Sequence, residues 1–346
     1  MRFPLIFESG CVSDDDVWFS ASDFNGLFKM SLKSKKIEYI GEFPNENGLK
    51  RRMHYGEALK VGSKIYFLPL ESRYMNIYNL KNNTFESYCI AQNSCGLTRG
   101  VIYGDYIYMF STRKSDTYRY NTVNNVFEKV PINNEMSKRG YCHGYYKYKN
   151  MIYLIQYKSN ILCQLDFDNL KMNYFYLSKN TDEFQIIGGK KELVYVINQK
   201  NSMIYTWNIK TENLQPQNIF YPMKLNSWQT DQYIVGNNKM GEKLQILYLD
   251  NHNIINTDVF QNENSKEQYI IQFAFEYQSS LYFIFNNALY SIKDGIILLE
   301  CDYDKELEKI RLDIAQNTDL KESGFDVLDE GKVLNLDCFL KSVLCN

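Results

Sequence analysis

One short strand of apolar and aromatic residues recurs along almost the whole sequence. Successive copies begin 39 to 48 residues apart. Repeats of roughly 40 to 50 residues are typical of β-propellers, in which each repeat forms one four-stranded blade that packs on its neighbours. The period therefore predicts a propeller. The copies are VWFS at Val17, IYFL at Ile65, IYMF at Ile107, IYLI at Ile152, VYVI at Val194 and LYFI at Leu281, with a weaker YIVG at Tyr233.

Each repeat also carries signals for the other three strands of a blade. A further strand candidate precedes each copy, and the strand that follows most copies ends in a bulky residue and Asn or Asp. That pair opens a polar turn, because Asn and Asp bond their own backbone and tolerate positive φ. Glycines near the start of the innermost strand allow the chains to approach closely. The pairs are Tyr78-Asn79, Tyr120-Asn121, Leu165-Asp166, Trp207-Asn208 and Leu249-Asp250, and the glycines are Gly56, Gly100, Gly144 and Gly188.

The sequence therefore predicts an all-β fold, a β-propeller of seven four-stranded blades, in a domain of residues 1–302. Because the copy at Tyr233 is weak, six blades or an irregular sixth unit is the alternative. A helical tail is predicted for 303–346, since Leu307, Ile310 and Ile314 share one helical face and 331–346 again has helix spacing. We expect the tail to pack on the propeller; partner binding is the alternative. The predicted blades are 1–43, 50–90, 96–132, 138–178, 183–219, 223–260 and 267–300.

An apolar strand followed by a strand that ends in an aromatic residue and Asn or Asp resembles the repeat of Kelch-like propellers. The resemblance covers residues 12–300 and implies the propeller fold. The sequence departs from this family because the diglycine that normally ends the first of these strands is missing after Phe67, Phe110 and Ile197. The partners of Kelch-like proteins are therefore not carried over to this chain.

The charge, the apolar segments and the cysteines of the sequence indicate where in the cell the protein occurs. The formal net charge of −2 gives no overall field that would attract nucleic acid or a membrane surface. No stretch approaches the roughly 20 apolar residues that cross a bilayer, and the N-terminus lacks a secretory pattern. The eight cysteines are scattered without a CxxC pair, which indicates no disulfide framework. We expect a soluble, monomeric, cytoplasmic protein.

A candidate ligand site lies where the innermost strands begin, at one mouth of the central channel. When the repeats are aligned, the segments that enter these strands carry arginines and histidines at similar positions. We expect these side chains to converge at the channel mouth. Planar guanidinium groups suit a carboxylate, a phosphate or an acidic peptide; the alternative is that they bond loop carbonyls or are solvated. Trp228 enters the sixth blade as a platform for a ligand or, alternatively, as packing between blades. The predicted ligand-binding residues are Arg52, His54, Arg99, Arg139, His143 and Trp228.

The sequence offers no catalytic signature beside this site. It contains no GxSxG, HExxH, P-loop or GxGxxG motif, and only two of its three histidines occupy comparable repeat positions, so we predict no metal and no cofactor. The predicted function is a non-catalytic binding or scaffolding propeller that presents its channel mouth to a protein, peptide or glycan. The alternative is an enzyme that acts on carbohydrate or peptide with the basic residues of this mouth.

Overall fold

The computed structural model forms a β-propeller of seven four-stranded sheets, as the repeat predicts. Within every sheet the four strands are neighbours in chain order, and the weak copy at Tyr233 forms a regular second strand of the sixth sheet. The six-bladed alternative is therefore wrong. The structure describes residues 10–21, 25–45, 56–90, 96–132, 139–220, 223–238, 244–257, 271–285, 287–293 and 296–317.

The strands of the first four blades lie inside the boundaries that the sequence predicts. Blade 1 contains β1 (Gly10–Ser13), β2 (Asp16–Ser20), β3 (Gly26–Ser31) and β4 (Lys36–Glu42); blade 2 contains β5 (Ala58–Val61), β6 (Lys64–Phe67), β7 (Tyr74–Asn79) and β8 (Thr84–Cys89). Blade 3 contains β9 (Leu97–Tyr103), β10 (Tyr106–Ser111), β11 (Thr117–Asn121) and β12 (Val126–Lys129); blade 4 contains β13 (Tyr141–Tyr148), β14 (Met151–Gln156), β15 (Ile161–Asp166) and β16 (Met172–Tyr176).

The last three blades follow the same order. Blade 5 contains β17 (Phe184–Lys190), β18 (Leu193–Asn198), β19 (Met203–Asn208) and β20 (Asn213–Phe220); blade 6 contains β21 (Met223–Gln229), β22 (Tyr233–Asn238), β23 (Leu244–Tyr248) and β24 (Ile254–Thr257). Blade 7 contains β25 (Ile271–Tyr277), β26 (Ser280–Phe285), β27 (Ala288–Lys293) and β28 (Ile296–Asp302), and the helix α1 (Asp304–Asn317) follows it.

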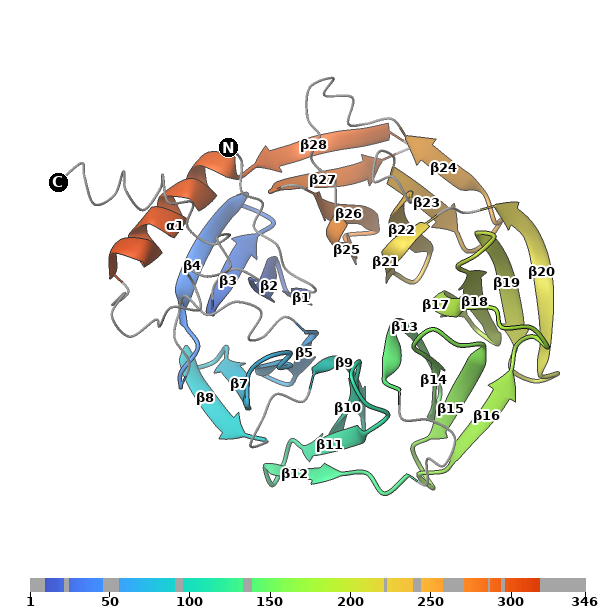
Figure 1. Cartoon of the computed structure of the whole chain (residues 1–346). Coiled ribbons are helices and arrows are strands. Elements are labelled where there is room, and N and C mark those ends of the chain that lie inside the picture. Colours follow the sequence, from blue (N-terminus) through green and yellow to red (C-terminus); the bar gives the residue numbers. More distant parts are fainter. Residues whose placement is uncertain are drawn as a thin grey trace. The chain divides into compact units, whose positions relative to one another are not determined.

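The chain divides into two compact units. The first comprises Met1–Leu97, Asn286–Tyr290 and Leu299–Asn346, and the second comprises Thr98–Phe285 and Ser291–Leu298. Within the second unit, Figure 1 shows β9, β13, β17 and β21 as the innermost strands and β12, β16, β20 and β24 as the outermost. The groove described below lies entirely in this unit. The predicted boundary between residues 302 and 303 stays a prediction.

The turns between the third and fourth strands have the chemistry that the sequence predicts. The Oδ1 atom of Asn208 accepts the backbone N–H groups of Lys210 at 2.9 Å and Thr211 at 3.1 Å. The last residue of this turn, Glu212, has a φ of 51°, which is uncommon for a residue other than glycine. The side-chain bonds of Asn208 thus hold a tight turn, and Glu212 ends this turn directly before β20.

A missing side chain allows two inner strands to meet. A Cβ atom on Gly144, in β13, would lie 1.7 Å from the backbone oxygen of Ile186, in β17 of the next blade. In blade 2, a Cβ on Gly56 would lie 2.7 Å from the backbone oxygen of Leu68. Both contacts are too short for any residue with a Cβ. The predicted reason for the glycines is therefore confirmed at these two positions.

Apolar faces of neighbouring blades pack on each other. Trp207, in β19, is 5% exposed and joins Phe184, Ile186 and Val196 in a core cluster with residues of blade 4. Its ring centroid lies 5.3 Å from that of Phe175, in β16. Because cores pack at high density, this contact fixes how far the outer strands of blades 4 and 5 separate.

The C-terminal helix α1 confirms the first part of the predicted helical tail, and it contacts β4 within the first unit (Figure 1). Just before the helix, Tyr303 is fully buried, and Leu307 is 3% exposed. The Nδ2 group of Asn287 donates to the Oδ1 atom of Asp304 at 2.9 Å. Residues 331–346 lie outside the described residues. Among the described helical residues, none forms a segment long and apolar enough to cross a membrane.

Candidate functional site

The structure describes the guanidinium groups of two of the predicted channel-mouth arginines. Arg99 lies in β9, is 6% exposed and donates from Nη1 to the carbonyl of Thr98 at 3.5 Å. Arg139 is exposed just before β13 and donates from Nη1 to the carbonyl of Lys158 at 3.1 Å. Both bonds are to backbone carbonyls, which is the structural alternative stated for these residues. The anion-binding cluster of guanidinium groups stays a prediction.

Of the other predicted ligand-binding residues, Trp228 is the one whose side-chain contacts the structure describes. Arg52 and His54 lie outside the described residues. His143 lies in β13, but its side chain is not described. Trp228, in β21, donates from Nε1 to the carbonyl of Ile271 at 3.4 Å and meets the ring of Phe273 edge-on at 5.7 Å. Since Ile271 and Phe273 belong to β25 of the next blade, these contacts are those of packing between blades.

A groove of about 540 Å³ lies on the outer side of the second unit, between blades 4 and 5. Its volume is in the range of sites that bind small molecules and side chains. We call it the β16 groove. Its lining residues come from β16 and the residue after it in blade 4, and from β19, β20 and the turn between them in blade 5. They are Tyr174, Phe175, Tyr176, Leu177, Tyr205, Trp207, Glu212, Asn213 and Leu214.

The lining pattern shows which part of β16 forms the wall of the groove. Four consecutive residues, from Tyr174 to Leu177, line it. Successive side chains of a strand point to opposite faces, so a groove that touches all four runs along the strand's edge. β16 is the last strand of its sheet, and in the described part of the chain its outer edge pairs with no other strand. The groove therefore runs along the outermost strand of blade 4.

The opposite wall is aromatic. Tyr205 and Trp207 are two residues apart in β19 and so lie on one face of that strand. Trp207 packs on Phe175, and Tyr205 meets the ring of Phe184 edge-on at 5.7 Å. On the rim of the groove, Tyr176 is 61% exposed, which is unusual for so large an apolar surface. The groove thus combines a rigid aromatic wall with an exposed aromatic side chain.

Glu212 is the one charged residue among those that line the groove. The neighbouring cation, Lys210, is engaged elsewhere, because its Nζ lies 2.6 Å from Oε1 of Glu192. Hydrogen bonding to Lys210 lowers the pKa of Glu192. Because Lys210 pairs with Glu192, the charge that Glu212 contributes to the groove is negative.

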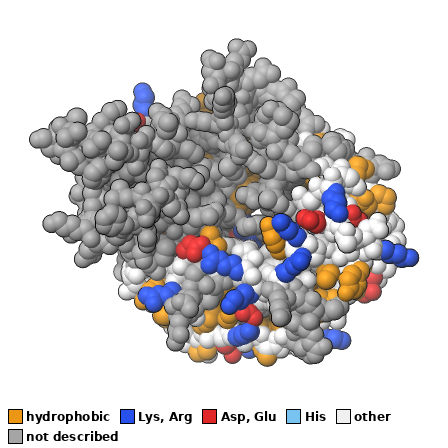
Figure 2. All heavy atoms as spheres, in the orientation of Figure 1, with side chains coloured by type: hydrophobic (Ala, Val, Ile, Leu, Met, Phe, Trp, Pro, Cys, Tyr) orange, Lys and Arg blue, Asp and Glu red, His pale blue; other side chains and the backbone are white. Residues whose placement is uncertain are grey.

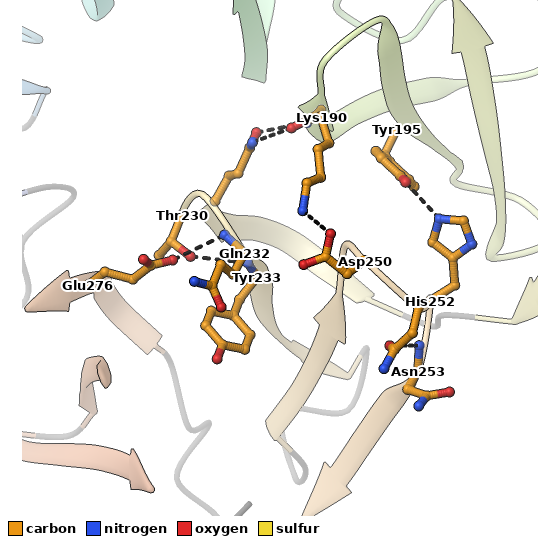
Figure 3. Close-up of polar contacts among 12 residues, drawn as sticks. Lys190, Tyr195, Thr230, Gln232, Tyr233, Asp250, His252, Asn253 and Glu276 are labelled. Carbon is orange, nitrogen blue, oxygen red and sulfur yellow. Dashed lines mark hydrogen bonds and ion pairs between the residues drawn. The ribbon is translucent and has the colours of Figure 1, made fainter. Parts of the chain in front are cut away.

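Polar contacts on the side of the second unit drawn in Figure 3 hold blades 5, 6 and 7 together. Lys190 and Asp250 point toward each other and form an ion pair that lowers the pKa of Asp250 (Figure 3). Tyr195 and His252 are joined through Oη and Nε2 at 2.7 Å. The Oε1 atom of Glu276 accepts the backbone N–H of Gln232 at 3.1 Å. Each contact joins consecutive blades, so this cluster stabilises the blade order.

Two of the described thiols, those of Cys142 and Cys163, are buried rather than activated. Burial raises the pKa of Cys142 to about 11 and also raises the pKa of Cys163. A nucleophilic cysteine instead needs a lowered pKa, because the thiolate is the reactive form. No two of the five described cysteines form a disulfide, and no described group of His, Cys, Asp and Glu residues is arranged to hold a metal ion.

The surface drawn in Figure 2 carries charges of both signs. In the part that is described, Lys and Arg side chains alternate with acidic and hydrophobic ones rather than gathering in one patch. Mixed charges of this kind produce little attraction for a polyanion beyond the first contacts. Recognition on this face therefore depends on individual side chains.

No protein-family model matches the sequence, and no curated protein matches it. Solved structures of other propellers are similar in fold. A catalytically inactive virginiamycin B lyase from Staphylococcus aureus with quinupristin gives a TM-score of 0.63 at 11% identity, covering 83% of this chain and 94% of that chain. BamB from Moraxella catarrhalis gives 0.52 at 12%, covering 84% and 82%.

The extracellular domain of a putative one component system from B. thetaiotaomicron gives a TM-score of 0.60 at 12% identity, covering 84% of this chain and 38% of that chain. At such low identity these likenesses show the fold alone. They come from different propeller families, so the Kelch-like repeat stays a prediction.

Proposed function

We propose that this chain is a non-catalytic binding propeller whose ligand site is the β16 groove. The observation that carries the proposal is that one groove combines the exposed ring of Tyr176 with an aromatic wall formed by Tyr205 and Trp207. Aromatic residues in concave sites supply much of the binding energy at protein interfaces. A rigid propeller suits this role because it holds the groove open without a change in shape.

Tyr176 is the best residue for a test. It is exposed, so its replacement by Ala removes an aromatic ring from the rim without opening a cavity in the core. Tyr157 is the matched control, because it belongs to the same blade, is 46% exposed and does not line the groove. Both variants should retain the circular dichroism spectrum and the unfolding transition of the wild type.

The experiment selects ligands from a displayed library of random linear peptides on the immobilised full chain. We expect a family of related peptides to be enriched, and synthetic copies should bind the Tyr176→Ala variant at least about tenfold more weakly. The Tyr157→Ala variant should bind them as the wild type does. Failure to enrich any peptide, or equal effects of the two substitutions, would contradict the proposed site.

A further inference from the structure

The charge of the β16 groove favours a cationic ligand. Glu212 is the one charged residue that lines the groove, and its side chain is exposed. In the described part of the chain no Lys or Arg forms an ion pair with it. Burial raises the pKa of Tyr153, in β14 of blade 4, and the negative charge of Glu212 adds to this rise. The carboxylate of blade 5 thus acts on blade 4 as well, and it attracts a positively charged group.

The aromatic residues of the groove favour a cation too. Phe175, Tyr205 and Trp207 line the same space as Glu212. The ring contacts of Phe175 with Trp207 and of Tyr205 with Phe184 hold these side chains in place. The face of an aromatic ring carries a negative potential and attracts a cation, more strongly where water is excluded. Neither the rings nor Glu212 attract an acidic side chain.

The apolar part of the groove distinguishes arginine from lysine. Leu177 and Leu214 also line the groove, and the methylene stem of an arginine covers apolar surface of this kind. Its guanidinium group is planar, so it stacks on a ring and offers two parallel N–H groups to one carboxylate. The ammonium group of lysine is compact and more strongly hydrated, and one carboxylate replaces only part of the water that it loses.

We infer that the β16 groove binds an arginine side chain of a partner protein, which stacks its guanidinium group on the aromatic wall and pairs it with the carboxylate of Glu212. This inference rests on the proposed function and names the group that the groove recognises. The volume of about 540 Å³ leaves room for residues beside this arginine, so a short peptide that contains it is a sufficient probe.

Glu212 permits a charge reversal that leaves the fold intact. It occupies the last position of the turn before β20 with a φ of 51°. Lys35 holds the equivalent position before β4 with a φ of 54°, so a lysine fits this turn. Asn125 holds it before β12 with a φ of 60°, so an asparagine also fits. Glu212→Lys and Glu212→Asn are therefore a matched reversed and neutral pair.

The experiment repeats the peptide selection on the wild type, Glu212→Asn and Glu212→Lys. We expect the wild-type peptides to carry Arg at one fixed position, the Asn variant to select it less strongly, and the Lys variant to select Asp or Glu there. Each wild-type peptide should bind Glu212→Lys at least about fivefold more weakly, since an attraction becomes a repulsion.

Synthetic copies of a selected peptide test the charge and the plane of the guanidinium group separately. Citrulline in place of the arginine keeps the planar shape and removes the charge, whereas lysine keeps the charge and removes the plane. Both peptides should bind the wild type at least about fivefold more weakly than the arginine peptide. The loss caused by citrulline should be at least about twofold smaller on Glu212→Asn, because the carboxylate that pairs with the arginine is then absent.

The outcomes separate this inference from the proposed function. If no peptide is enriched, or if Tyr176→Ala binds the enriched peptides as the wild type does, both fail. If binding depends on Tyr176 but the peptides share no arginine, or if citrulline or lysine replaces it without loss, the inference is overturned while the site stands. Binding of an oligosaccharide array, or a dimer of this chain, that is lost in Tyr176→Ala would also overturn the arginine as occupant.

Discussion

Gly144 of β13 lies so close to Ile186 of β17 that a Cβ atom would sit 1.7 Å from the Ile186 carbonyl oxygen. The innermost strands of blades 4 and 5 therefore pack backbone against backbone. This contact, together with the Phe175–Trp207 ring contact near the periphery, sets the spacing of the two blades that form the β16 groove.

The substitution Gly144→Ala should destabilise the protein by about 3 kcal/mol or more, because the strands must separate to accept the methyl group. Gly104→Ala is the control: Gly104 has a φ of 57° and no atom within 4 Å of the place its methyl group would take, so only backbone strain of about 1 to 2 kcal/mol is expected. Urea unfolding of both variants measures the difference. Equal losses would mean that β13 and β17 do not pack this closely.

Half-buried tyrosines should make the protein less stable at alkaline pH. Burial raises the pKa of Tyr146 and of Tyr174 to about 12, whereas an unfolded tyrosine titrates near 10. Above pH ~10 the unfolded chain releases protons that the folded chain retains, so the stability that is fully present below this pH is lost as pH rises toward ~12. The unfolding free energy should fall through this window.

The variant Tyr146→Phe tests this expectation, since it removes one of these phenols while keeping the ring. Its unfolding free energy should fall less steeply with pH than that of the wild type. Because Phe also loses the 3.0 Å bond from Tyr146 Oη to the Lys191 carbonyl, the slope rather than the absolute stability is the readout. Parallel pH curves for the two proteins would contradict the assignment.

The exposed and the buried cysteines should differ in their rates of alkylation. Cys89 is exposed, whereas Cys142 is 9% exposed with a pKa raised to about 11 and Cys163 is fully buried. Alkylation by iodoacetamide near pH 8, followed by mass spectrometry, should label Cys89 in the native protein. Cys142 and Cys163 should be labelled after unfolding. Native labelling of Cys163 at the rate of Cys89 would contradict the packing of blade 4.

The fold could be predicted from the sequence because its signals are local. The recurring strand and the turns opened by residues such as Asn121 and Asn208 depend on neighbouring residues alone. The copy at Tyr233 is weak since Gly236 and Asn237 interrupt its apolar run. It still forms β22, because pairing with strands on both sides overrides the local preference.

The β16 groove could not be predicted in the same way. Its walls are the edge of one blade and the face of the next, so it depends on a spacing that no single repeat encodes. The sequence directed attention to the first strands and to Arg99, whose described bond is to a backbone carbonyl. One signal was available in the fourth strand of blade 4, which contains the aromatic run NYFY. Three aromatic residues in an outermost strand, one of them the exposed Tyr176, indicate a surface that binds something other than water.

The fluorescence of Trp207 tests most directly whether the β16 groove is the binding site. Trp207 lines the groove, and replacement of Trp18 and Trp228 by Phe leaves it as the one tryptophan of the chain. Titration with a selected peptide should change the Trp207 emission with the midpoint that calorimetry gives for binding. An unchanged Trp207 emission at peptide concentrations that saturate the protein would place the ligand elsewhere and contradict the account.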